Sequence, residues 1–407
     1  MDRLTNTVRP YAWGSTTAIP ELLGVEPTGE PQAEMWMGAH TGAPSHLTRD
    51  GAQVSLAQAL AADPERELGP AATARFGPRL PFLLKLLAAG SPLSLQVHPD
   101  RAQAQAGFAD EEARGVPLDA PHRNYKDDNH KPELICALTP FDGLCGFRRP
   151  EEAAELLDGL GVDALKPYVD ILRASPETDA LREVLTAVLS AEPAAMAEAV
   201  EAATAAAGRL GAGDGPHSDA YAAYAAIAHH YPGDPGVIAA MLLHHVRLQP
   251  GEALYLGAGI PHAYLSGLGV ELMANSDNVL RCGLTPKHVD VPELLRVVRF
   301  EAGDPGVLRP EATKGEEVYE TPIDEFRLSR FLLAPDADAR PLPAGAPQIV
   351  LCTAGSVALR RTGEGTGRGA DELTLAPGES AFVPADESVL LTGDGTAFRA
   401  TVALTTR

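Results

Sequence analysis

The chain has 407 residues and a formal net charge of −22, with 45% hydrophobic and 22% charged residues. This length allows two or three domains with a sizeable buried core, and the composition is that of a globular protein. The strong negative charge argues against nucleic acid or an anionic membrane surface as a partner. An anionic ligand would therefore need a local cluster of Lys and Arg.

The cysteines and the N-terminal residues indicate a cytoplasmic protein. The four cysteines are widely spaced, lack a Cys-x-x-Cys motif and lie among apolar residues, which favours buried free thiols over disulfides. The first residues contain no apolar signal segment, and no uncharged apolar run reaches the 18 residues of a membrane span. We expect a cytoplasmic monomer without a membrane anchor. The cysteines are Cys136, Cys145, Cys282 and Cys352.

The N-terminal part predicts short strands followed by helices. Residues 1–60 mix strand-like pieces with turns and contain both tryptophans, Trp13 and Trp36, which we expect in the core because large aromatic side chains usually pack there. Residues 51–79 have a helical composition. An apolar strand is predicted over residues 80–87, and it carries Lys85. Such a lysine either extends its ammonium to the surface or faces an anion.

Residues 94–98, Ser-Leu-Gln-Val-His, are predicted to end the next strand. Side chains alternate between the two faces of a strand, so Ser94, Gln96 and His98 point the same way. An amide oxygen beside an imidazole forms half of a metal site suited to zinc or a similar divalent ion. Taken alone, the pair is weak evidence for a metal, because a surface glutamine and a hydrogen-bonded histidine occur in most proteins.

A second candidate ligand follows the polar segment 121–131. Asp127-Asp128-Asn129 predicts a turn, and a strand begins near Pro132, a position where proline is tolerated. Glu133 enters this otherwise apolar strand. A carboxylate there must be paired, protonated or bound to a metal to offset its desolvation.

Residues 150–231 change to Ala, Glu and Leu at helical spacing, with helix starts at Ser175-Pro176-Glu177 and at Pro193. We expect an all-helical insertion without catalytic residues. The pairs His229-His230 and His244-His245 are predicted on helices, where adjacent side chains point in different directions and chelate poorly.

Strand patterns resume at residue 246 and continue to the end of the chain. Short alternating segments joined by Gly-rich turns favour an antiparallel sandwich or barrel. The C-terminal strands are predicted at 326–333, 348–351, 357–361, 380–383, 389–391 and 398–404.

A faint internal repeat predicts two related β domains. Residues 250–256, Pro-Gly-Glu-Ala-Leu-Tyr-Leu, resemble 377–383, Pro-Gly-Glu-Ser-Ala-Phe-Val, but only the first copy continues to a histidine, His262. This pattern resembles the second half of a cupin barrel motif. The predicted fold is mainly β with an α insertion: two cupin-like jelly-roll β-sandwich domains plus an inserted all-helical domain. The predicted boundaries are 1–149 and 232–315 for a discontinuous catalytic domain, 150–231 for the insertion, and 316–407 for a C-terminal domain without metal ligands.

Four residues could together hold one Zn²⁺: Gln96, His98, Glu133 and His262. The single carboxylate of this set neutralises one of the two positive charges of Zn²⁺. A charge of about +1 is then left to polarise a substrate oxygen. A nitrogen and oxygen ligand set without thiolates is typical of catalytic zinc.

Five stretches, in order along the chain, resemble type I phosphomannose isomerases. They are YAWGS (11–15), AEMWMG (33–38), LPFLLKLL (80–87) with SLQVHPD (94–100), NYKDDNHKPEL (124–134), and PHAYLSG (261–267) through ELMANSDNVLRCGLTPKHVDV (271–291). The resemblance spans roughly residues 9–149 and 245–300, whereas the helical and C-terminal parts match only in character. It implies that the four candidates above are zinc ligands.

The resemblance also implies a reaction and roles for further residues. The family interconverts mannose 6-phosphate and fructose 6-phosphate through a cis-enediol, a step of mannose and GDP-mannose metabolism. Three residues are carried over as catalytic and five as substrate-binding. The catalytic residues are Lys131, Glu271 and Arg281; the substrate-binding residues are Lys85, Ser94, Lys287, His130 and Asp277.

We expect Glu271 to shuttle the proton, with Lys131 or His130 as alternatives. Arg281, Lys85 and Lys287 would neutralise the phosphate, and Ser94 would donate a hydrogen bond.

Two other functions are compatible with a cupin scaffold. A metalloenzyme such as an oxygenase would use ferrous iron and usually more histidines. A non-catalytic sugar-phosphate-binding protein would be expected to lack a metal ligand or Glu271. For the C-terminal domain we expect a structural role, with a regulatory site as the alternative.

Overall fold

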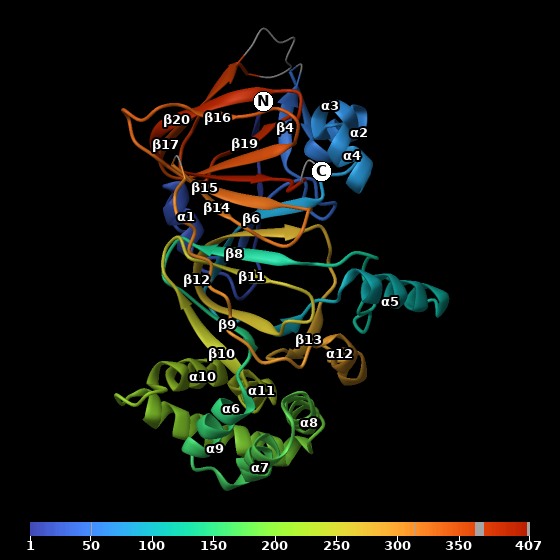
Figure 1. The fold of residues 1–407 in the computed structure, drawn as a ribbon, viewed down its shortest axis with the longest axis vertical. Helices are drawn as coiled ribbons and strands as arrows, with labels where there is room; N and C mark the ends of the chain where they lie inside the picture. Colours follow the sequence, from blue (N-terminus) through green and yellow to red (C-terminus); the bar gives the residue numbers. More distant parts are fainter. Residues whose placement is uncertain (50, 314, 363–369, 405–407) are drawn as a thin grey trace.

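The computed structural model describes residues 1–49, 51–313, 315–362 and 370–404. Two large antiparallel sheets lie one above the other in Figure 1, and a group of helices, drawn in green, covers the lower end. The first and the last strand of the chain, β1 and β20, both belong to the upper sheet (Figure 1). Within these ranges, the helices are too short or too polar to cross a bilayer.

The lower sheet has ten strands and is organised around β12, which pairs with four other strands. Its main order is β10-β9-β12-β6-β3-β2, with β8 and β7 also on β12, β11 on β8 and β13 on β7. The strands are β2 (Thr7–Arg9), β3 (Glu34–Met37), β6 (Phe82–Ala89), β7 (Leu95–Val97), β8 (Glu133–Ala137), β9 (Phe141–Phe147), β10 (Leu243–Leu248), β11 (Ala253–Leu256), β12 (His262–Ala274) and β13 (Leu280–Gly283).

A bulge divides β12 into two halves. Residues 262–266 pair with β7 and β9, whereas 267–274 pair with β6 and β8, and the register shifts between Tyr264 and Ser266. Gly267 has φ 120°, and a Cβ there would lie 2.7 Å from the Pro140 carbonyl oxygen. In a regular strand, two residues nine positions apart point to opposite faces. The extra residue of the bulge reverses this alternation, so the side chains of His262 and Glu271 lie on the same side of the sheet.

The upper sheet has eight strands, in the order β1-β19-β17-β20-β15-β14, with β16 on β20 and β18 on β17. They are β1 (Asp2–Leu4), β14 (Glu316–Tyr319), β15 (Arg327–Leu333), β16 (Arg340–Leu342), β17 (Gln348–Thr362), β18 (Glu372–Leu375), β19 (Ser380–Val383) and β20 (Ser388–Thr401). A separate hairpin is formed by β4 (His46–Arg49) and β5 (Ala52–Ser55).

Two of the predicted strand divisions in this sheet are wrong. The segments 348–351 and 357–361 belong to the single strand β17, and 389–391 and 398–404 fall largely in β20. The intervening Gly, Ser and Thr residues predicted a loop, but β17 and β20 keep pairing through an irregularity between Cys352 and Ala354. The first strand, β1, also belongs to this sheet, although its residues fall in the N-terminal segment that we had grouped with the catalytic domain. Residues 405–407 of the predicted C-terminal domain lie outside the described residues.

The green helices in Figure 1 follow β9 and continue to Met241, beyond the predicted end at residue 231. The α9 helix begins at Pro193 as predicted, whereas α8 begins at Glu177 with Pro176, not Ser175, as its N-cap. Prediction of His244 and His245 on a helix is wrong, because both lie in β10. The elements are α6 (Pro150–Gly159), η1 (Asp163–Leu165), α7 (Lys166–Ala174), α8 (Glu177–Leu189), α9 (Pro193–Gly211), α10 (Ser218–His230) and α11 (Gly236–Met241).

The remaining helices lie beside the two sheets (Figure 1). Five short helices and one longer helix, α5, precede or follow the strands of the lower sheet. They are α1 (Ala18–Leu23), α2 (Leu56–Ala62), α3 (Pro64–Leu68), α4 (Pro70–Phe76), α5 (Arg101–Ala113) and α12 (Val291–Val297).

A shared hydrophobic core joins the two sheets. One face of β6, with Leu84 and Leu86, packs in the same cluster as Phe326 and Ile349 of the C-terminal part. The other face of β6 carries Lys85 and points into the lower sheet's own interior. All four cysteines are buried free thiols, as predicted.

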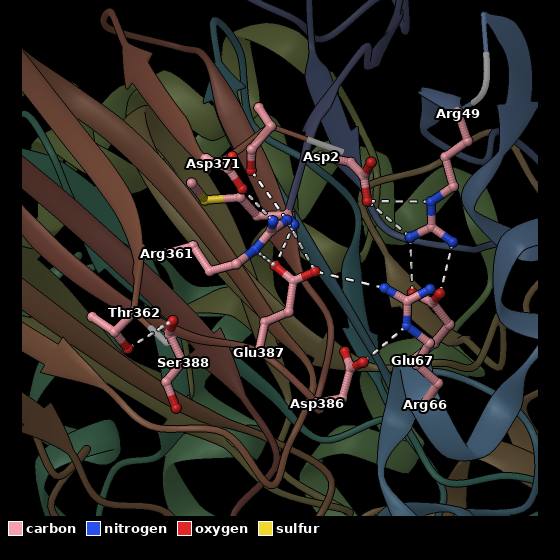
Figure 2. Close-up of polar contacts among 12 residues, drawn as sticks. Asp2, Arg49, Arg66, Glu67, Arg361, Thr362, Asp371, Asp386, Glu387 and Ser388 are labelled. Atoms are coloured by element: carbon pink, nitrogen blue, oxygen red, sulfur yellow. Dashed lines mark hydrogen bonds and ion pairs between the residues drawn. The ribbon is translucent and has the colours of Figure 1, made fainter. Parts of the chain in front are cut away.

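A buried ion network also links α3 and β4 to the upper sheet (Figure 2). Arg49 lies between Asp2 and Glu67, with nitrogen–oxygen distances of 2.8 and 2.6 Å. Arg66 lies 2.9 Å from Asp386 and 3.7 Å from Glu387. Because Asp2 and Glu67 are buried, Arg49 supplies the positive charge that their burial requires.

Candidate metal centre and active site

Three strands of the lower sheet bring a ligand group together at their ends. Gln96 on β7 lies directly opposite His262 on β12 and opposite Arg281 on β13. Residues at opposite positions of antiparallel strands carry their side chains on the same face, a few ångströms apart. The register therefore places an amide, an imidazole and a guanidinium side by side.

His98, Glu133 and His262 form a buried group that could hold a metal ion. The Nε2 atoms of the two histidines lie 3.4 and 3.5 Å from the two carboxylate oxygens of Glu133. Tetrahedral zinc with bonds of about 2.0–2.2 Å separates its ligand atoms by about 3.4 Å, so this spacing fits one zinc ion.

The hydrogen bonds of both imidazoles prepare them as ligands. His98 Nδ1 lies 2.8 Å from the Asn278 carbonyl oxygen, and His262 Nδ1 lies 2.9 Å from that of Ile260. Donation from Nδ1 leaves each Nε2 with a free lone pair. Burial lowers the pKa of His98 to about 4, which keeps its ring neutral.

Two buried atoms of this group need a partner. Within the described part of the chain, His98 Nε2 and one oxygen of Glu133 have no hydrogen-bond partner. Buried polar atoms are almost always satisfied, so the orphaned lone pairs fit a bound cation. Zinc held by these side chains would neutralise negative charge on a substrate oxygen.

Gln96 and Lys131 contact members of this group. The Gln96 amide lies 3.4 Å from His262 Nε2, and rotating the amide would present its oxygen as a fourth ligand. Lys131 Nζ lies 3.1 Å from Glu133. Burial opposes ionisation of Glu133, but the charge of Lys131, with help from the imidazoles, holds its pKa well below the ordinary value.

Lys85 does not stand free as a phosphate-binding group. It lies opposite Glu271 on the neighbouring strand, and its Nζ is 2.9 Å from Glu271 and 3.5 Å from Glu34. The ammonium also lies 5.4 Å from the centre of the Trp36 ring. All four side chains are buried. The contact between Lys85 and substrate stays a prediction, and in this structure the ammonium contacts two carboxylates.

The Lys85 cluster includes residues that sequence reasoning missed. Glu34 had a visible signal, since it is a charged residue inside the buried strand β3, and Trp36 was assigned only a core role. Burial alone would lower the pKa of Lys85, but Glu271 and Glu34 outweigh it and raise that pKa. Burial raises the pKa of Glu271, although Lys85 opposes the shift.

A cavity of about 680 Å³ opens beside the ligand group. Ser94, Gln96, Arg281 and Lys287 all line it. Burial lowers the pKa of Arg281, and burial and repulsion by Arg281 lower that of Lys287. Neither cation has an ion-pair partner among the described residues. Two unpaired cations in one cavity, in an acidic protein, form a local site for an anion.

Comparison with known proteins agrees with this site. Residues 1–150 match the family model for the phosphomannose isomerase type I catalytic domain. The chain is 40% identical to mannose-6-phosphate isomerase of Escherichia coli K12, over 97% of this chain and 98% of that one, and 33% identical to the Bos taurus enzyme over 95% and 94%. The chain belongs to the type I phosphomannose isomerase family.

Solved structures of the family have the same fold. A zinc-bound mannose 6-phosphate isomerase superposes with a TM-score of 0.88 at 39% identity, covering 99% of both chains. A mutant of the Salmonella typhimurium enzyme gives 0.89 at 39% identity, covering 99% of this chain and all of the other. Zinc in the first of these two structures agrees with the His98, Glu133 and His262 group.

Two residues expected at the phosphomannose isomerase site make contacts elsewhere. His130 Nε2 lies 2.7 Å from Glu325 and 2.9 Å from Arg101, which favours a structural role for its ring. Asp277 lies 3.3 Å from His40 and lines a second cavity of about 400 Å³.

Tyr264 is a further site residue that sequence reasoning missed. Its hydroxyl is buried and has no hydrogen-bond partner within the described ranges. Burial, followed by the charges of Glu271 and Glu133, raises its pKa well above the ordinary value. The only sequence signal was its place two residues after His262 on the same strand.

The helices between β9 and β10 also reach the cavity. His230 and Tyr231, at the end of α10, line it together with Trp13. No catalytic residue is expected from residues 150–231. His230 and Tyr231 nevertheless form part of the cavity wall.

Proposed function

We propose that the chain interconverts mannose 6-phosphate and fructose 6-phosphate, with one Zn²⁺ per chain. One observation carries this proposal: Gln96 touches the metal-binding group through His262 and lines the same cavity as Arg281 and Lys287. A sugar phosphate needs both elements, a metal for its oxygens and cations for its phosphate. Relatives at 40% identity over nearly the full length are named for this reaction.

In the proposed reaction, the proton at C2 is removed, a cis-enediol forms, and a proton returns at C1. Arg281 and Lys287 bind the phosphate, and Ser94 donates a hydrogen bond from the same wall. Glu271 shuttles the proton, which its raised pKa supports, and Lys85 positions its carboxylate. Lys131 places positive charge beside the developing oxyanion.

Four ligands are proposed for the zinc: Gln96, His98, Glu133 and His262. One chain supplies every residue of the proposed site, so we propose that the monomer is the active unit. The product would enter mannose and GDP-mannose metabolism, an inference that rests on the family resemblance.

We also propose that both sheets are cupin-like jelly rolls, the upper one without metal ligands, and that residues 150–231 are an insertion into the lower one. The repeated Pro-Gly-Glu segments support this, because they precede corresponding strands, β11 and β19. Gly251 and Gly378 of the two turns both have positive φ, 91° and 82°. Only the first copy leads to a histidine.

Turnover tests this function directly. Purified protein is incubated with mannose 6-phosphate, and fructose 6-phosphate is followed with and without a chelator. We expect turnover that chelation abolishes and added zinc restores. Absence of turnover in protein that contains one zinc per chain would contradict the isomerase function.

A further inference from the structure

The segment between α10 and α11, residues 231–235, connects the helical insertion to two distant parts of the lower sheet. Tyr231 binds the segment before β7, and Asp234 binds the segment after β13. Both segments line the cavity of the proposed site. The end of the insertion therefore contacts both walls of that cavity.

Asp234 accepts three backbone hydrogen bonds. Its Oδ1 lies 2.7 Å from the Gly236 nitrogen and 3.1 Å from the Leu284 nitrogen, and its Oδ2 lies 3.1 Å from the Thr285 nitrogen. Residues 284–287 line the cavity and end at Lys287. The Asp234 carboxylate thus anchors the backbone that presents Lys287.

The anchored backbone is strained. Leu284 has φ 55°, and it is the one non-glycine residue with a positive φ in the described part of the chain. A branched, buried side chain adopts this conformation only where the surroundings enforce it. At this strained position Asp234 accepts two hydrogen bonds, donated by the backbone nitrogens of Leu284 and Thr285.

Close packing at the same junction leaves no space for another arrangement. A Cβ on Gly236 would lie 2.5 Å from the Leu284 nitrogen, and a Cβ on Gly283 would lie 2.5 Å from the Gly236 Cα. Backbone therefore packs on backbone between the start of α11 and the end of β13. The charged carboxylate and this contact together determine where residues 284–287 lie.

Tyr231 makes the corresponding contact with the opposite wall. Its hydroxyl donates to the Pro92 carbonyl oxygen at 2.7 Å. Pro92 precedes Ser94 and Gln96, so this bond holds the segment that leads into β7. The same short segment of the insertion therefore braces the wall with Ser94 and the wall with Lys287.

We propose that Asp234 is a positioning residue for substrate affinity, which holds residues 284–287 so that Lys287 and Arg281 meet the phosphate together. Tyr231 supports the opposite wall. This inference rests on the proposed function, because it assigns the phosphate to that cavity. It gives the helical insertion a role in substrate binding through backbone contacts.

The test compares Asp234→Asn with the wild-type holoenzyme. Asparagine has the same shape but loses the charge and one acceptor oxygen, so the anchor of the loop is weakened and no cavity is left. We expect KM for mannose 6-phosphate and the inhibition constant of inorganic phosphate each to rise at least about tenfold, since hydrogen bonds to a charged group are among the stronger ones. Zinc content should be unchanged, and kcat should stay within about threefold because the ligand group is untouched.

Glu192→Gln is the matched control. Glu192 lies in the same insertion and accepts hydrogen bonds from the backbone nitrogens of Ala194 and Ala195 at the start of α9, 3.1 and 2.8 Å away. The Glu192→Gln variant loses a comparable contact between a carboxylate and the backbone. Its KM should not change, because Glu192 does not line the cavity. Tyr231→Phe removes a single oxygen, and we expect it to raise KM in the same direction, by a smaller factor.

An unchanged KM in Asp234→Asn would overturn the inference, as would equal losses of kcat and zinc, which indicate a purely structural role. If Asp234→Asn fails to fold, Tyr231→Phe decides, and an unchanged KM there counts against the proposal. If the wild type does not turn over mannose 6-phosphate, the proposed function fails separately. Calorimetry with inorganic phosphate then tests the inference: weaker binding to Asp234→Asn supports it, and equal or absent binding overturns it.

Discussion

Lys85 Nζ lies 2.9 Å from Glu271 Oε2, and the two residues occupy directly opposite positions of β6 and β12. Glu34 lies 3.5 Å from the same ammonium. One buried cation thus faces two buried carboxylates and supplies the positive charge that their burial requires.

Replacement of Lys85 by methionine should destabilise the protein. Two buried carboxylates lose their counter-charge, and breaking a buried pair in this way typically costs about 3–5 kcal/mol in free energy of unfolding. Urea denaturation measures the loss. The double variant Lys85→Met/Glu271→Gln should recover part of it, because the second change removes one uncompensated charge.

Lys166→Met is the control for that experiment. Lys166 lies 3.8 Å from Asp170 on the exposed face of α7, and such surface pairs contribute at most about 1 kcal/mol. If Lys85→Met and Lys166→Met had equally small effects, the buried ion cluster would be unimportant for stability.

Glu271→Gln should lower kcat at least about 100-fold if Glu271 shuttles the proton. The amide keeps the shape of the side chain but cannot accept a proton. Zinc content, measured alongside by elemental analysis, should stay the same. A nearly normal kcat would move the base assignment to Lys131, since His130 lies against Glu325 and Arg101.

Glu133→Gln should lose zinc. The carboxylate is the charged member of the ligand group, and even residues that merely orient ligands change metal affinity by about 10–100-fold. Zinc per chain after dialysis against a weak chelator should fall well below that of the wild type. Glu252→Gln, a change in a partly exposed carboxylate of the turn before β11, serves as the control and should retain the metal.

Arg49→Met should weaken the attachment of α3 and β4 to the upper sheet. It leaves Asp2 and Glu67 buried without the guanidinium that contacts both of them in Figure 2, at a cost of about 3–5 kcal/mol. Chemical denaturation measures this cost. Arg75→Met, which removes an exposed pair with Asp324, should have almost no effect; a comparable loss there would contradict the interpretation.

The pair of Asp142 and His245 should make stability depend on pH. The hydrogen bond from His245, 3.0 Å away, lowers the pKa of Asp142 although burial opposes the shift. A carboxylate with a lowered pKa stabilises the fold above its unfolded pKa, which is about 3.9, and loses this effect as pH falls through its folded pKa.

Melting temperatures of wild type and Asp142→Asn, compared from neutral pH downward, test this dependence. The wild type should be the more stable protein above about pH 4, and the difference should disappear on further acidification. A difference that grows as the pH falls would contradict the assignment.

The residues of the candidate metal group could be proposed from the sequence because they have local signatures. Glu133 is a charge within an apolar strand, and Gln96 and His98 alternate at a strand end. Burial and alternation are properties of a single strand, so they can be read before its partners are known. The helical segment and the buried thiols were predictable for the same reason.

The partners of the charged residues could not be predicted from local sequence. Lys85 could face a phosphate or a carboxylate, and only the register of β6 against β12 decided for Glu271. His130 precedes Lys131 in the chain, yet its ring contacts Glu325, which lies far along the sequence. The continuous strands β17 and β20 depend in the same way on their mutual pairing.

Asp234 marks this division most clearly. It lies in an ordinary turn sequence between two helices, and nothing local distinguishes its carboxylate from that of a solvated loop residue. Its role arises because three backbone nitrogens, two of them from the segment after β13, converge on it. The sequence alone specified which residues are buried, charged or able to bind zinc, since these are properties of single residues and their near neighbours. The tertiary structure decided which charge meets which, because those pairs are set by strand register and by loops that meet only in the folded chain.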